Sequence, residues 1–226
     1  MKIAVLGTGM VGRAVAGRTA QLGHEVAVGT RDPHATLART DSDAMGNPPF
    51  GVWHADHPEV GPTTFADAAA GAELVVNATA GASSIEVLRL AGAANLAGKV
   101  LIDIANPLDF SAGFPPTLTV TDTDSLGEQI QRAFPDATVV KTLNTLNATL
   151  MVEPAELADA DHSIFVSGDD AGAKATVTEL LRSFGWKDVV DLGDLSTARG
   201  TEMLMPIWLR LMNALGTPAF NFKIVR

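Results

Sequence analysis

"KIAVLGTGMVGRAVAGR", residues 2–18, decides the fold. An apolar run typical of a buried strand leads into three glycines spaced G-x-G-x-x-G, and a helical pattern follows them. In this motif the first glycine permits a tight turn, the second lets a pyrophosphate approach the backbone, and the third lets the helix pack closely on the strand. The start of the helix offers free N–H groups to the anion. The stretch therefore predicts a dinucleotide site at Gly7, Gly9 and Gly12.

The rest of the chain alternates short apolar runs with longer helical patterns, which is typical of α/β proteins. The runs "VLIDIA" and "TVVKTL" are apolar on both faces, as in a parallel sheet covered by helices on both sides. We expect a doubly wound, mostly parallel Rossmann-type sheet with a small C-terminal helical addition. The expected strands are Lys2–Leu6, Glu25–Val28, Glu73–Asn77, Lys99–Ile104, Thr138–Thr142, Ser163–Val166 and Asp188–Asp191. The expected helices are Val11–Leu22, Pro33–Ala38, Phe65–Ala70, Ser84–Ala91, Ser125–Phe134 and Ala171–Phe184.

A chain of 226 residues suits one main domain with a modest elaboration. We expect a dinucleotide-binding domain with substrate-side loops over residues 1–195, and a C-terminal helix and tail over residues 196–226. The segment 44–64 is rich in Gly, Pro and His. We expect a loop there that holds at most one short strand.

The segment "TEMLMPIWLRLMNALG", residues 201–216, is apolar on almost every side, so a helix formed by it must be buried all round. Pro206 is expected to kink or restart this helix. Because a terminal helix packed on one domain normally exposes one face, we predict a homodimer. The alternating tail at 220–225 either crosses to the partner or packs on its own chain. The residues expected to be shared between subunits are Met203, Met205, Trp208, Leu211 and Met212.

Composition excludes several classes of function. A net charge of −10 and a pI near 4.8 oppose binding to nucleic acid or to an anionic membrane surface. No apolar run approaches the roughly 20 residues of a membrane helix, and the N-terminus does not resemble an export signal, so a cytoplasmic location is expected. The absence of Cys excludes thiolate nucleophiles and cysteine-based zinc sites. The histidines of "HADH" have no obvious third ligand, and we expect no metal site.

The end of the second expected strand indicates which dinucleotide binds. Enzymes of this fold that prefer NAD place a carboxylate there to bind the ribose hydroxyls. This chain instead has Thr30 and Arg31, and a hydroxyl beside a guanidinium suits the 2′-phosphate of NADP(H). The alternative is that Arg31 is an ordinary surface charge paired with Asp32.

Three further loops follow strands at the edge of the sheet where ligands bind. We expect the first two, at 77–84 and 105–109, to contact the nicotinamide and its ribose. Asn106 and Pro107 are equally compatible with turn formation alone. The third loop, "KTLNTLNATLMVEP", mixes polar and apolar residues in a way that suits a planar amphipathic substrate. The expected cofactor contacts are Asn77, Thr79, Ala80, Asn106 and Pro107, and the expected substrate-side residues are Lys141, Asn144 and Thr145.

Four stretches together resemble the NADP-dependent 8-hydroxy-5-deazaflavin reductases, which use coenzyme F420. They are "KIAVLGTGMVGRAVAGRTAQLGHEVAVGTRD", "VLIDIANPLD", "SLGEQIQRAFPDATVVKTLNT" and "SIFVSGDDAGAKATVTELLRSFGW". The resemblance covers nearly the whole chain and is strongest in the cofactor half. It implies hydride transfer between NADPH and a deazaflavin or a flavin such as FMN or FAD. It also implies that the C-terminal helix helps to close the substrate cleft. Carried over by position, the residues that meet the pyrophosphate are Gly7, Thr8, Gly9, Met10, Val11 and Gly12.

The chain contains no Tyr, which many carbonyl-reducing dehydrogenases use as a proton donor. Hydride transfer between two stacked rings needs positioning more than an acid or base, so we assign no catalytic residue. Two alternatives stay open at this point. The first is a sensor or scaffold that binds NADP without turnover. The second is a reductase of a small carbonyl or imine, in which Lys141, Asp103 or a histidine donates the proton.

Overall fold

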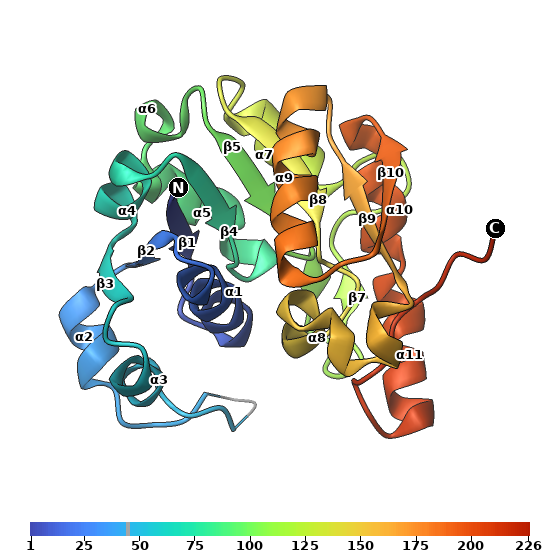
Figure 1. The fold of residues 1–226 in the computed structure, drawn as a ribbon, viewed down its shortest axis with the longest axis horizontal. Coiled ribbons are helices and arrows are strands. Elements are labelled where there is room, and N and C mark those ends of the chain that lie inside the picture. The colour runs from blue at the N-terminus through green and yellow to red at the C-terminus, as the bar shows by residue number, and fades with distance from the viewer. Residues whose placement is uncertain (44–45) are drawn as a thin grey trace.

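The computed structural model describes residues 1–43 and 46–226, and in these residues a twisted eight-stranded sheet runs through the protein (Figure 1). The strand order is β10-β9-β8-β5-β4-β1-β2-β3, and the pairs are parallel except for β8 with β9. The chain reverses direction across the sheet beside β1, as in a doubly wound fold. The predicted fold class is confirmed. The strands are β1 (Lys2–Leu6), β2 (Glu25–Thr30), β3 (Gly61–Thr64), β4 (Leu74–Asn77), β5 (Val100–Asp103), β8 (Thr138–Thr142), β9 (Ser163–Ser167) and β10 (Asp188–Gly193).

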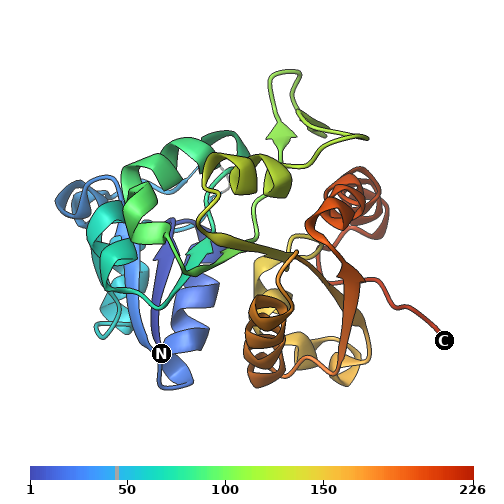
Figure 2. The same ribbon diagram turned by 90° about the horizontal axis from the view of Figure 1, so that it is seen from above.

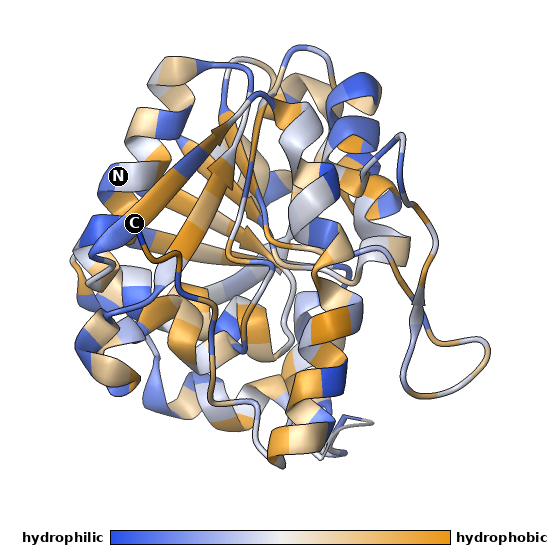
Figure 3. Cartoon of the chain, turned by 90° about the vertical axis from the view of Figure 1, so that its right-hand side faces the viewer, coloured by the Kyte–Doolittle hydropathy of each residue, from blue (hydrophilic) through white to orange (hydrophobic). Residues whose placement is uncertain are grey.

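Helices cover both faces of the sheet, and successive residues of one strand serve the two faces in turn (Figure 2). Ile3 and Val5 of β1 pack in one core, and Ala4 and Leu6 pack in the other. Figure 3 shows the strands as mainly hydrophobic segments between helices of mixed hydropathy. The first core includes residues of α1 (Met10–Gln21), α3 (Phe50–Asp56), α8 (Ala148–Val152) and α9 (Ala171–Phe184). The second includes residues of α4 (Phe65–Gly71), α5 (Gly81–Ala91), α6 (Ala93–Leu96), α7 (Leu126–Ala133) and α10 (Ala198–Met203).

Local signals fix the ends of these helices. Ser125 caps α7 by accepting a hydrogen bond from the Glu128 N–H, and the Ser125 hydroxyl donates to the Glu128 carboxylate. Asp170 caps α9, and Gly185 ends it in the left-handed conformation. The helix α1 differs, because no side chain caps its N-terminus. Its first N–H groups are therefore available to an external acceptor.

The irregular segment 44–64 contains more structure than predicted. Residues 44–45 lie outside the described part, but the rest holds the helix α3 as well as the short strand β3. The expectation of a loop was wrong for 50–56. The rings of Trp53 in α3 and of His57, its C-cap, stack with centroids 4.3 Å apart, and they lie against Gly17 of α1. Packing on α1 thus stabilises a helix whose Gly and Pro neighbours concealed it.

The segment after β5 forms a hairpin that the sequence did not predict. Its strands β6 (Leu108–Asp109) and β7 (Thr117–Leu118) are antiparallel, and the hairpin projects from the body of the protein (Figure 2). Phe110 and Phe114 near its tip are 59% and 58% exposed. The antiparallel β8–β9 pair, the helices α6 and α8, and the six-residue helix α10 were also not predicted.

The C-terminal segment corrects two expectations. Residues 201–216 are divided between α10 and α11 (Met205–Leu215), and Pro206 lies in the first turn of α11, where it restarts the helix. Burial all round is wrong, since Ile207 and Leu215 are 48% and 56% exposed. The opposite face of α11 packs through Trp208 on Phe220 of the tail, with ring centroids 5.3 Å apart.

The tail follows β9 of its own chain and forms no strand. The Ser163 N–H donates to the Phe222 carbonyl at 2.9 Å, and the Ile224 N–H donates to the Ser163 hydroxyl at 2.9 Å. The predicted division at residue 195 falls within a 3-10 helix, Leu195–Thr197, and stays a prediction. Among the described residues, no helix combines the length and the apolar character that crossing a membrane would require.

Candidate functional site

The turn between β1 and α1 needs two of its glycines for its own packing. Gly7 has a φ of +126°, and a Cβ placed there would lie 2.6 Å from the Ala78 carbonyl oxygen. A Cβ at Gly12 would lie 2.1 Å from the Gly7 carbonyl oxygen. Both distances are far shorter than a van der Waals contact, so a side chain at either position would push the turn apart.

Gly9 is different, because none of the described residues requires a glycine there. A Cβ on Gly9 would have no atom of the described residues within 4 Å, and its φ of −75° suits any residue. Gly9 is also the N-cap residue of α1, and it has no side chain to cap the helix. The open space over a bare backbone at a free helix start is what a bound pyrophosphate requires, so this turn fits the predicted dinucleotide.

This contrast leads to a prediction about Gly9→Ala. The substitution should cost at most about 1 kcal/mol of unfolding free energy, the usual difference between Gly and Ala at an N-cap. It should weaken NADPH binding at least about tenfold, because the new methyl group occupies the place of the pyrophosphate. Chemical denaturation and calorimetric titration measure the two effects. Gly12→Ala is the matched control and should lose stability as well as affinity. Unchanged NADPH affinity in Gly9→Ala would contradict the assignment.

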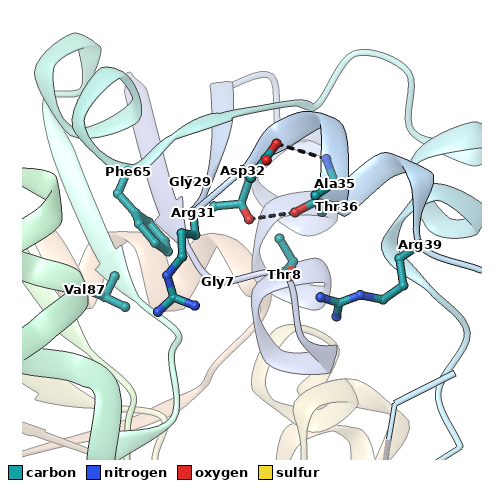
Figure 4. A pocket seen from close by; sticks show the side chains of 11 residues that line it. Gly7, Thr8, Gly29, Arg31, Asp32, Ala35, Thr36, Arg39, Phe65 and Val87 are labelled. Carbon is teal, nitrogen blue, oxygen red and sulfur yellow. Dashed lines mark hydrogen bonds between the residues drawn. The ribbon is translucent and has the colours of Figure 1, made fainter. Parts of the chain in front are cut away.

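A pocket of about 360 Å³ lies beside this turn, between the ends of β1 and β2 and the helix α2 (Pro33–Ala38). Figure 4 shows the guanidinium groups of Arg31 and Arg39 on opposite sides of the pocket, with Thr8 between them. Two guanidinium groups around one polar hollow offer the kind of donors that bind a phosphate. The lining residues are Gly7, Thr8, Gly29, Thr30, Arg31, Asp32, Ala35, Thr36, Arg39, Phe65 and Val87.

The polar groups of the pocket have defined partners. The Thr30 hydroxyl is buried and lies 2.8 Å from the Thr36 hydroxyl. The Asp32 carboxylate caps α2 by accepting from the Ala35 N–H at 3.0 Å. Arg31 instead has a weak, exposed ion pair with Glu86 of α5 at 3.4 Å. An exposed pair of this kind stabilises little and leaves Arg31 able to turn to a ligand.

Arg39 was not among the predicted pocket residues. It directly follows the helix Pro33–Ala38, and that helix carries the chain across the pocket, so Arg39 lies opposite Arg31. The available signal in the sequence was an arginine at the end of a helix that begins beside Thr30 and Arg31, the residues predicted to bind the 2′-phosphate. Sequence spacing alone does not show that the two guanidinium groups share a pocket.

A second group of predicted residues meets at the ends of β4, β5 and β8. Asn77 is fully buried, and its amide donates to the Ser84 hydroxyl at 3.0 Å and to the Asp103 carboxylate at 2.8 Å. The side-chain oxygen of Asn77 accepts from the Thr79 hydroxyl at 2.6 Å. Ala80 is the extended N-cap of α5. Asn77 therefore holds the loop after β4 in shape.

The loops after β5 and β8 are joined through two asparagines. The Asn106 amide donates to the Asn144 carbonyl oxygen at 2.7 Å, and the Asn144 amide donates to the Asn106 side-chain oxygen at 2.9 Å. Leu143, the residue before Asn144, has a φ of +59°, an unfavourable conformation for leucine. Such strain is concentrated at functional sites. The neighbouring Thr145 is 1% exposed, and its hydroxyl has no partner among the described residues.

Pro107 is buried, and its carbonyl oxygen accepts from the Thr119 N–H at 2.8 Å at the base of the hairpin. A Cβ at Gly81 would lie 2.0 Å from the Asn106 carbonyl oxygen, so the loops after β4 and β5 are in direct backbone contact. The three loops therefore form one connected rim. The predicted contacts on this rim, Asn77, Thr79, Ala80, Asn106, Pro107, Asn144 and Thr145, stay predictions.

Lys141 was expected on the substrate side, but the structure places its side chain inside the protein with no exposed surface. Its ammonium lies 2.7 Å from the Asp103 carboxylate and 2.8 Å from the Glu202 carboxylate, and it also donates to the Ala105 carbonyl oxygen. Burial by itself lowers the pKa of the Lys141 ammonium, but the two carboxylates outweigh it and raise that pKa. Lys141 is therefore a charged internal residue, and a direct substrate contact stays only a prediction.

The two histidines of "HADH" have different surroundings. The His54 ring stacks on Phe50 with centroids 6.0 Å apart, and its Nδ1 has no hydrogen-bond partner among the described residues. His57 Nδ1 lies 3.0 Å from the Trp53 carbonyl oxygen, and its ring stacks on the Trp53 indole. Within residues 1–43 and 46–226, no group of three or more His, Asp or Glu side chains could hold a metal ion. The candidate site therefore has two parts. One is the pocket between Arg31 and Arg39, and the other is the rim formed by the loops after β4, β5 and β8.

Comparison with known proteins agrees with this geometry. Residues 2–107 match the family described as NADP oxidoreductase, coenzyme F420-dependent. A crystal structure from Arthrobacter sp. FB24, described as a candidate F420-dependent NADP reductase, shares 67% sequence identity, covers 100% of both chains and gives a TM-score of 0.95. The chain belongs to the F420-dependent NADP oxidoreductases. The resemblance found in the sequence is confirmed.

More distant relatives belong to the same group of reductases or contain a related unit. The F420-dependent NADP reductase of Methanothermobacter marburgensis is 28% identical, over 93% of this chain and 92% of that protein. Metalloreductase STEAP3 from Rattus norvegicus is 29% identical over 92% of this chain. The present chain spans only 38% of STEAP3, so that likeness concerns one part of a larger protein. These names support the prediction that the protein is an oxidoreductase.

Proposed function

We propose that this F420-dependent NADP oxidoreductase family member transfers hydride between NADPH and a deazaflavin of the coenzyme F420 type. One observation carries the proposal. The Gly7–Gly12 turn, with its open space at Gly9, adjoins a pocket that contains both Arg31 and Arg39. A dinucleotide with an extra phosphate satisfies both features at once, because one anion sits at the helix start and the other lies between two guanidinium groups.

Each end of the site has its own role in the proposal. Residues Gly7–Gly12 bind the pyrophosphate, and Thr30 and Arg31 bind the 2′-phosphate. We add Arg39 to the 2′-phosphate group because it lines the same pocket. The rim after β4, β5 and β8 orients the nicotinamide and the second ring.

When bound, NADPH supplies the hydride and the deazaflavin ring accepts it, and the same contacts serve the reverse direction. The protein must hold the two reacting carbons about 3–3.5 Å apart and exclude water from them. The Asn106–Asn144 pair suits this task, since its two mutual hydrogen bonds fix both loops relative to each other. No protein acid is required when hydride passes between two rings, in agreement with the absence of Tyr.

The test is to mix the protein and NADPH with F420, FMN, FAD or a simple carbonyl compound and to follow the oxidation of NADPH. Turnover with F420 well above that with the other acceptors is expected. Faster turnover with FMN or FAD would assign a flavin as the acceptor. Tight NADPH binding without turnover on any acceptor would instead support a sensor.

We further propose that residues 196–226 close the substrate cleft and that the protein is a homodimer through this region. The exposed side chains of Ile207, Leu215, Phe110 and Phe114 support the proposal, because one side of α11 and the hairpin tip both present large apolar groups. The cytoplasmic location stays a prediction.

Ile207→Glu is expected to convert the dimer to a monomer, since it places a charge in the proposed apolar interface. Sedimentation velocity at several protein concentrations measures the change. Leu90→Glu, which alters an exposed leucine on α5, is the matched control and should leave the dimer intact. A wild-type protein that sediments as a monomer at all concentrations would refute the dimer.

A further inference from the structure

We propose that Lys141 is a positioning residue that fixes the C-terminal helix α10 relative to the loops that hold the reacting rings. The inference rests on the proposed function, because it gives those loops their role. The Lys141 ammonium has three hydrogen-bond acceptors, and they belong to three different segments. Asp103 ends β5, Ala105 lies in the loop after β5, and Glu202 lies on α10. One buried cation thus joins the sheet, a rim loop and the C-terminal segment.

The first branch of this network runs toward the cofactor rim. The Asp103 carboxylate accepts from Lys141 on one oxygen, and on the other it accepts from the Asn77 amide at 2.8 Å and the Ala105 N–H at 3.2 Å. Asn77 in turn accepts from the Thr79 hydroxyl. The orientation of the loops after β4 and β5 therefore depends on a carboxylate that Lys141 holds in place.

The second branch runs into the C-terminal segment. The Glu202 carboxylate accepts from the Leu126 N–H at 2.8 Å and the Gly127 N–H at 3.1 Å, at the start of α7. The same carboxylate binds Lys141. Glu202 is 1% exposed, so a charged residue of α10 lies in the interior of the main domain. The position of α10 is thus fixed by hydrogen bonds of defined direction as well as by apolar contact.

The main effect of this network is to fix the positions of the groups that it joins, and its charges explain why. Lys141 carries one positive charge against the two negative charges of Asp103 and Glu202, and the α7 amides face the surplus. Well-packed apolar residues often stabilise a core as much as buried ion pairs do. What the ion pairs add is a requirement that each donor meet its acceptor. A shift of α10 would break these hydrogen bonds and would displace Asn77 and Ala105, which bind the Asp103 carboxylate.

The experiment compares Glu202→Gln with Glu128→Gln in the full chain. Glu202→Gln keeps the size of the side chain and removes one charge from the network. Glu128→Gln is the matched control, since Glu128 also joins α7 to α10, through an ion pair with Arg199, but does not contact Lys141. Hydrogen–deuterium exchange of the peptides covering 77–84, 104–109 and 30–39 is measured together with kcat, KM and the NADPH dissociation constant.

Glu202→Gln is expected to increase exchange in 77–84 and 104–109 and to leave 30–39 unchanged. Its kcat should fall about ten- to hundredfold, as expected when reacting groups are misplaced by about 1 Å. The NADPH dissociation constant should change less than about threefold, because the phosphate pocket is untouched. Glu128→Gln should behave like the wild type. If Glu202→Gln does not fold, Asp103→Asn removes the charge on the other side of Lys141 and is measured in the same way.

Unchanged exchange in both rim peptides of the folded Glu202→Gln protein would overturn the proposal. So would equal effects in Glu128→Gln, which would indicate general loosening, or a kcat within twofold of the wild type despite altered exchange. The exchange measurement needs no acceptor. Should the wild type fail to reduce F420, the proposed function fails on its own, and the exchange pattern still decides whether Lys141 links α10 to the rim.

Discussion

Lys141→Met is expected to lower the free energy of unfolding by about 3–5 kcal/mol, the usual cost of removing one partner of a buried ion pair. The substitution leaves the carboxylates of Asp103 and Glu202 inside the protein without a counter-charge. Urea denaturation at pH 7 measures the loss. The triple variant Asp103→Leu, Lys141→Met, Glu202→Leu is the control and should recover much of the stability, since it removes all three charges together.

The pH dependence of Lys141→Met provides a second readout. The deficit of the variant should be complete at pH 7 and should shrink at high pH, where the wild type also loses the ammonium charge. In the wild type the pKa of Lys141 is raised from 10.5, so its contribution is complete below that pH and is lost as the pH rises through the folded-state pKa. A loss below 1 kcal/mol that does not vary with pH would contradict the charge assignment.

Arg31→Ala is expected to weaken NADPH binding by about ten- to hundredfold, the value of one charge-assisted contact to a phosphate. NADH affinity should change less than about twofold, because NADH carries no 2′-phosphate to meet the guanidinium. Fluorescence titration with both nucleotides measures the difference. Arg39→Ala should shift the preference in the same direction, because Arg39 lines the same pocket.

Arg89→Ala provides the matched control for these arginines. Arg89 is an exposed arginine on α5 that does not line the pocket, so its removal tests for a general effect of charge on nucleotide binding. It should leave both affinities unchanged. Equal losses of NADPH and NADH in Arg31→Ala would show that Arg31 does not recognise the phosphate.

The part of the fold that local signals specify could be predicted from the sequence. The glycine spacing at 7, 9 and 12 and the apolar runs around it identified β1, α1 and the doubly wound sheet. Helices with strong caps, such as α9 after Asp170, were also predicted with their observed bounds. In these segments the chain needs no distant partner to define the element.

What the sequence could not reveal depends on residues that are distant along the chain. The helix α3 forms because Trp53 and His57 pack on α1, a contact that no local pattern contains. Lys141 looked like a charge at a strand end, and only the fold brings Asp103 and Glu202 to it. Arg39 was missed for the same reason, since only the fold places it in one pocket with Arg31. A lysine in an apolar strand context should therefore prompt a search for two acidic partners.

Isotope transfer tests the central claim most directly. NADPH deuterated at nicotinamide carbon 4, prepared separately on each face of the ring, is incubated with the protein and F420, and the reduced deazaflavin is analysed by mass spectrometry. We predict that one of the two preparations transfers its deuterium to the deazaflavin and that the other transfers none, because the site holds the two rings in one orientation. Reduced deazaflavin without deuterium from either preparation, or no reduction at all, would contradict direct hydride transfer in this site.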